Sequence, residues 1–149
     1  MDKKKVVYLV LGIVVTVAFW VFNSQVYELV FYDNDYSNAM YNYSGYGIIA
    51  IITIALAWGA AALFYYVINS VKFARWYHWL AVCAVVTVVT PVVCYLVNNS
   101  MLESQGLDLS TQAVDFEIAN FFWAPVLYTV ASFAMRWWSS NCRHTPFPQ

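Results

Sequence analysis

Few residues of the chain have the types and spacing that chemistry requires. Cys83 and Cys94 are eleven positions apart in one apolar run, which separates them by about 16 Å on a helix. Cys142 and His144 form a pair two positions apart, and two ligands are a weak signal for a metal ion. The sequence has no Cys-x-x-Cys pair and no evident pairing of a nucleophile with a base. We therefore predict no catalytic residue, no metal and no cofactor, and we expect a protein that is not an enzyme.

Prolines and hydroxyl groups form a second pattern in two of the apolar runs. Pro91 and Pro125 each leave a backbone carbonyl without its usual donor, because proline has no N–H. Both prolines lie about 15–18 Å from the expected inner ends of their helices. Nearby hydroxyls either bond the freed carbonyls or form a polar seam that lines a path for a solute or ion. The residues of this polar seam are Thr87, Thr90, Pro91, Pro125, Thr129 and Ser132.

Acidic side chains gather in two loops between the apolar runs, residues 23–47 and 98–117. These loops contain no Lys or Arg. Carboxylates accompanied by Tyr and Asn suit a basic or polar partner, because aromatic and hydrogen-bonding groups supply contact area. The candidate partner-binding residues are Glu28, Asp33, Asp35, Glu103, Asp108, Asp115 and Glu117.

The basic residues occupy the other segments outside the apolar runs. They are Lys3, Lys4, Lys5, Lys72, Arg75, Arg136 and Arg143. Short cytoplasmic segments of membrane proteins accumulate Lys and Arg, and this bias sets the orientation of the chain. We therefore expect both termini in the cytoplasm and both acidic loops on the outer side.

Four apolar runs must position these residues. They cover residues 6–22, 48–68, 79–97 and 118–135, and none contains Asp, Glu, Lys or Arg. Crossing about 30 Å of hydrocarbon takes about 20 helical residues. We predict an all-α polytopic membrane protein, with one membrane domain over residues 1–149 and four transmembrane helices in a bundle. Asp108 and Ser110 are candidate caps for a helix that continues into the fourth run.

The composition agrees with this class. Apolar residues make up 62% of the chain and charged residues 10%, and the mean hydropathy is +0.60. Soluble domains carry about 25% charged and about 45–50% apolar residues. These values exclude a soluble enzyme domain, a disordered chain and a nucleic-acid binder with a basic patch. The first run is long for a signal peptide and lacks a small-x-small cleavage site, so we expect it to be retained.

Small residues mark one face of the second run. Ala55 and Gly59 are four positions apart, as are Ala57 and Ala61. This spacing lets the backbones of neighbouring membrane helices approach closely. We expect a packing surface that serves either the internal bundle or a neighbouring subunit.

Together these patterns predict a non-enzymatic membrane subunit that binds a partner through its acidic outer loops, as a scaffold, accessory or immunity-type protein. The alternative is a small homo-oligomeric channel or pore that conducts cations, with the acids at its mouth. The expected partners are the lipid bilayer and other copies or other membrane subunits, and not nucleic acid. Short loops and a compact lysine start are typical of the bacterial cytoplasmic (inner) membrane.

Overall fold

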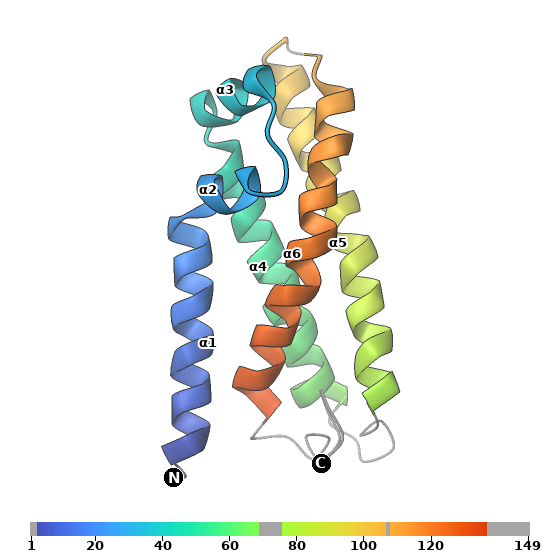
Figure 1. Ribbon diagram of the computed structural model, residues 1–149. Coiled ribbons are helices and arrows are strands. Elements are labelled where there is room, and N and C mark those ends of the chain that lie inside the picture. Colours follow the sequence, from blue (N-terminus) through green and yellow to red (C-terminus); the bar gives the residue numbers. More distant parts are fainter. Residues whose placement is uncertain (1–2, 69–75, 107, 137–149) are drawn as a thin grey trace.

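The computed structural model describes residues 3–68, 76–106 and 108–136 (Figure 1). Every regular element in these ranges is a helix. Four of the described helices are long and apolar enough to cross a membrane: α1 (Lys3–Val21), α4 (Gly45–Ala62), α5 (Trp76–Ser104) and α6 (Ser110–Met135). Helix α4 continues as a π-helical segment, η1 (Leu63–Ile68). The all-α prediction with four such helices is confirmed, and it supports a multi-pass transmembrane protein.

Helices α5 and α6 extend well beyond the uncharged runs. Helix α5 ends at Ser104 and α6 begins at Ser110, so most of the predicted loop 98–117 is helical. The predicted bounds stopped at charged or polar residues, whereas backbone groups continue to bond in a helix regardless of side-chain polarity. Helix α6 does run directly into the fourth apolar run. Its N-cap, however, is Leu109, which has no side-chain capping bond, and the Ser110 hydroxyl instead donates to Asp108 at 3.2 Å.

Two short helices take the place of the first predicted loop. Helices α2 (Asn23–Glu28) and α3 (Asn34–Asn42) lie above the upper end of α1, at the level of the upper parts of α5 and α6 (Figure 1), and we call residues 23–42 the α2–α3 cap. The carboxylate of Asp33 accepts the backbone N–H of Tyr36 at 3.0 Å, which satisfies a donor at the start of α3. Ser44 adopts a left-handed conformation with φ of 56° and turns the chain into α4.

Helix α6 is the central long helix. It contacts α1, α4 and α5, and it is the most buried of the four membrane-crossing candidates, whereas α1 is the least buried. Small side chains on its packed faces allow close approach of the neighbouring helices. The fully buried alanines of α6 are Ala113, Ala119, Ala124, Ala131 and Ala134.

Helix α1 meets α6 through a glycine. Gly12 is one of only two buried residues of α1, with Phe19 as the other. A Cβ atom at Gly12 would lie 2.7 Å from the Cβ of Ala134, a distance that cannot be relieved by side-chain rotation. Nearby, the indole of Trp58 donates to the Thr16 hydroxyl at 3.0 Å and links α4 to α1. Close backbone approach and one polar contact therefore hold the peripheral helix.

We expect Gly12→Ala to lower the free energy of unfolding by about 1–3 kcal/mol, because overpacking forces the two backbones apart. The matched control is Gly59→Ala, since nothing lies within 4 Å of a Cβ at Gly59. That control should be neutral or stabilising by up to about 1 kcal/mol, because alanine favours the helix. Unfolding in detergent mixtures, followed by circular dichroism, measures both. Equal effects of the two substitutions would contradict the packing described for α1.

Candidate functional site

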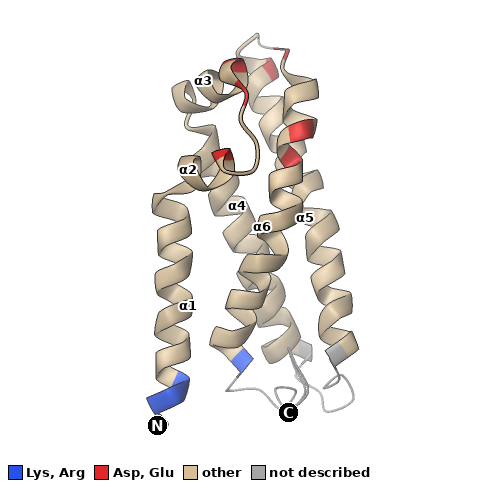
Figure 2. Ribbon diagram, in the orientation of Figure 1, with Lys and Arg blue, Asp and Glu red and all other residues tan. Residues whose placement is uncertain are grey.

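Charge is divided between the two ends of the molecule. Figure 2 shows the described Asp and Glu residues toward the end that carries α2 and α3, and the described Lys and Arg residues at the opposite end. We call these the acidic end and the basic end. The acids predicted to bind a partner all belong to the acidic end, but the structure gives them three different surroundings.

Two of the acids share a recess at the surface. A cleft of about 470 Å³ lies between α3 and the connection from α5 to α6. Asp35 and Asp108 bring exposed carboxylates to it from these two segments, and Asn38 and Asn42 bring exposed amides. We call this recess the acidic cleft. Its lining residues are Asp35, Asn38, Ala39, Asn42, Tyr43, Gly106, Asp108 and Leu109.

Four other acids lie outside this cleft. Glu103 and Asp115 are exposed, and Glu103 accepts a hydrogen bond from Asn99 at 3.0 Å. Glu28 accepts the hydroxyl of Ser37 at 2.6 Å and so joins α2 to α3. Asp33 caps α3, as described above. Glu28 and Asp33 therefore have local structural partners within the α2–α3 cap.

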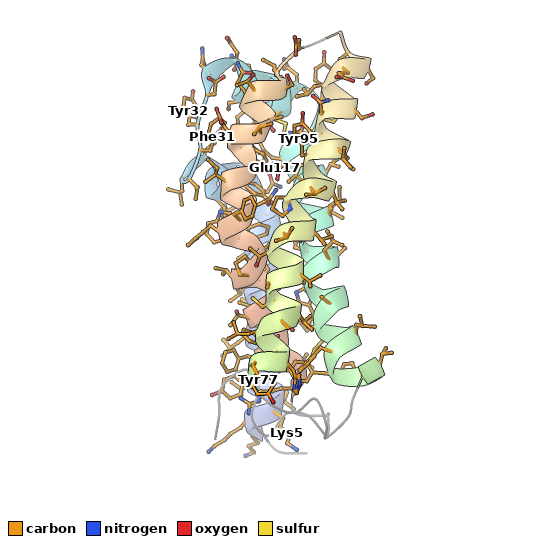
Figure 3. All side chains as sticks on the ribbon, turned by 90° about the vertical axis from the view of Figure 1, so that its right-hand side faces the viewer. Lys5, Phe31, Tyr32, Tyr77, Tyr95 and Glu117 are labelled. Carbon is orange, nitrogen blue, oxygen red and sulfur yellow. The ribbon has the colours of Figure 1, made fainter. Side chains whose placement is uncertain are left out.

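Glu117 differs from the other acids because it is buried. Its side chain is 5% exposed, and Figure 3 places it between the ribbons of α5 and α6, far from Lys5 and Tyr77 at the basic end. It was predicted as part of an exposed loop, but it lies inside a helix and is not available at the surface. The sequence does contain a signal for this placement. Glu117 and Asn120 are three positions apart, and residues with this spacing share one face of a helix.

Glu117 belongs to a set of polar side chains drawn from five elements. We call this set the buried polar cluster, and all its members are buried. They come from α2, α3, α4, α5 and α6. The members are Tyr27, Tyr36, Thr53, Cys94, Asn98, Glu117 and Asn120.

Asn120 is the centre of the hydrogen bonds in this cluster. Its Oδ1 accepts the hydroxyl of Tyr27 at 3.0 Å and lies 3.2 Å from the hydroxyl of Thr53. Its Nδ2 donates to Oε2 of Glu117 at 2.7 Å. The Tyr27 and Thr53 hydroxyls are themselves 3.1 Å apart. One amide on α6 thus connects α2, α4 and the buried carboxylate.

The cluster also reaches the cap and α5. Nδ2 of Asn98 on α5 donates to the hydroxyl of Tyr36 on α3, and the Thr53 hydroxyl lies 3.7 Å from the sulfur of Cys94. Burial raises the pKa of Tyr27 and Tyr36, and the nearby Glu117 carboxylate raises it further. Both phenols therefore remain neutral at physiological pH.

Three of the four hydroxyls of the predicted polar seam bond within their own helices, and the fourth, on Thr90, is buried without a hydrogen-bond partner among the described residues. Thr87 donates to the carbonyl of Cys83 and Thr129 to that of Pro125, each at 2.8 Å. Ser132 donates to the Tyr128 carbonyl at 2.7 Å and accepts the indole N–H of Trp79 at 2.8 Å. These bonds favour a packing role over a path for a solute.

The small residues of α4 divide into two faces. Ala57 and Ala61 are fully buried in the hydrophobic core. Ala55 and Gly59 are exposed and line an apolar groove of about 310 Å³ between α4 and α5, together with Thr90. The first pair therefore packs inside the molecule, and a neighbouring subunit at the second pair stays a prediction.

Comparison of the chain with protein-family models, with curated proteins and with solved structures finds no match.

Replacing Asn120 should show how much the cluster contributes to folding. We expect Asn120→Ala to lower the free energy of unfolding by about 2–4 kcal/mol, because the Glu117 carboxylate loses its donor and the Tyr27 hydroxyl loses its acceptor. Asn99→Ala is the control, because it removes an amide whose bond to Glu103 is exposed, and it should change the value by less than about 0.5 kcal/mol. Denaturation in detergent measures both, and a similar small loss in each would show that the cluster is not an important stabilising contact.

Proposed function

We propose that the chain is a non-enzymatic subunit of a membrane complex and that it docks a basic segment of another protein in the acidic cleft. The observation that carries this proposal is the placement of the Asp35 and Asp108 carboxylates in one recess. Carboxylates and amides together suit a Lys or Arg side chain, because each N–H of the cation finds an oxygen acceptor. Tyr43, also part of the lining, adds an aromatic surface for a cation.

The cleft is held in place by the contacts beneath it. Asp35, Asn38 and Asn42 all belong to α3, and α3 is fixed by the Asp33 cap and by the bond from Tyr36 to α5. A preformed site loses less entropy on binding than a flexible loop. Docking is therefore better supported than the alternative of a homo-oligomeric cation channel, which depends on contacts between copies.

The proposed orientation places the acidic end outside and both termini in the cytoplasm of a bacterial inner membrane. The separation of acids from bases along the molecule supports it, because positive segments are retained in the cytoplasm. A docked partner would then be an extracytoplasmic protein or the outer part of another membrane subunit.

Photocrosslinking tests the docking proposal. With benzoylphenylalanine at Asn38, native membranes should yield a discrete adduct of this chain with another protein. The double variant Asp35→Lys, Asp108→Lys should reduce that adduct at least about tenfold, because it places positive charge against a positive partner. Glu103→Lys, an exposed acid outside the cleft lining, is the control and should leave the adduct within about twofold. An adduct that survives the double variant would count against docking at the cleft.

Cysteine labelling tests the orientation. In a Cys142→Ser background, where Cys83 and Cys94 are buried, Glu103→Cys should react with an impermeant maleimide on intact cells. Lys4→Cys should react only after the membrane is permeabilised. The reverse pattern would show that the acidic end faces the cytoplasm.

A further inference from the structure

The buried polar cluster contains two oxygen acceptors that have no hydrogen-bond partner among the described residues. They are Oε1 of Glu117 and Oδ1 of Asn98. The two side chains are 5% and 0% exposed, so bulk water does not compensate them. Thr53 connects the two helix faces that carry them. Its hydroxyl lies 3.2 Å from Oδ1 of Asn120, one turn from Glu117 on α6, and 3.7 Å from the sulfur of Cys94, one turn from Asn98 on α5. A buried acceptor without a donor is costly, which indicates that something further occupies this cluster.

The negative charge of an ionised Glu117 limits which occupants are suitable. An ionised carboxylate inside a protein needs an opposite charge, yet the described Lys and Arg residues lie at the basic end (Figure 2). Besides Glu117, the titratable groups of the cluster are the phenols of Tyr27 and Tyr36 and the thiol of Cys94. None of these supplies a positive charge. A water molecule can donate to both acceptors, but it leaves the carboxylate unbalanced.

The ligand chemistry points to a hard monovalent cation. The cluster contains one carboxylate, two amide oxygens and three hydroxyls, and oxygen ligands of this kind suit hard metal ions. A single carboxylate balances a single positive charge. The described residues contain no group of three or more His, Cys, Asp or Glu that would hold a metal ion of another kind. A proton on Glu117 would balance the same charge with one hydrogen bond, whereas a metal ion binds several of the cluster's oxygens at once.

We propose that the buried polar cluster binds a monovalent alkali cation, with Glu117 and Asn98 as ligands. The ion would join α6 to α5 and, through the bond from Asn98 to Tyr36, would stabilise the α2–α3 cap. Acidic groups within membrane proteins are rare and mark ion sites in many transporters. This site uses none of the residues that line the acidic cleft, so it stands or fails separately from partner docking.

Thermal unfolding of the full chain in nanodiscs tests the proposal. The melting temperature is measured in choline chloride and in NaCl or KCl, at one pH and one ionic strength. We expect a saturable rise on the order of 5 °C in Na⁺ or K⁺ at saturation. Identical melting temperatures in all three salts would overturn the proposal. A protein that responds to pH but to neither metal ion would also overturn it, with a proton as the occupant.

Three variants locate the effect. Glu117→Gln keeps the shape and the acceptor for Asn120 but removes the charge, so the response to the ion should disappear. Asn98→Ala removes the second ligand. It should raise the ion concentration that gives half of the rise in melting temperature by about tenfold or more. Asp115→Asn, an exposed acid two positions away on the same helix, is the control and should respond as the natural chain does. An ion response that persists in Glu117→Gln would assign the cation to another place.

Discussion

Polar groups enclosed among apolar helices must be bonded to one another, and most of the acidic end depends on this constraint. Asn120 satisfies this constraint for three neighbours, because its side-chain amide bonds Tyr27, Thr53 and Glu117. In hydrocarbon, an unsatisfied amide or hydroxyl costs several kcal/mol. The chain segments that carry these partners are therefore held together where they meet. The α2–α3 cap, which an apolar surface alone would position loosely, gains a defined place against α4, α5 and α6.

The basic end is organised by a different kind of contact. There, α1 and α6 approach through Gly12 and Ala134, and α4 packs Ala57 and Ala61 into the core. Small residues act through dispersion, which needs close contact but little directional geometry. The molecule thus combines close packing along its length, with single bonds between helices such as that from Trp58 to Thr16, and a hydrogen-bond network of several side chains at one end. The same end holds the acidic cleft, so the hydrogen-bond network lies at the end that carries the exposed carboxylates of Asp35 and Asp108.

Apolar runs predicted the four long helices because length and lack of charge depend only on the local sequence. The same rule failed at Glu117, where a single acid ended the predicted run although the helix continues through it. It also failed for residues 23–42, because the α2–α3 cap is held by contacts between residues far apart in sequence, such as Tyr27 with Asn120. Asp35 and Asp108 were predicted as binding residues, but their meeting in one cleft depends on tertiary structure. The spacing of Glu117 and Asn120 on one helix face was the available signal for the cluster.

We expect the α2–α3 cap to form a rigid surface at the acidic end, because it is bonded to the buried polar cluster. Hydrogen–deuterium exchange of the full chain in lipid nanodiscs tests this claim most directly. Amides of α3 and of the acidic ends of α5 and α6 should be protected to a similar degree, because they belong to one bonded unit. Exchange of residues 34–42 within seconds, with α5 and α6 still protected, would show that the cap is an open loop and would contradict the account.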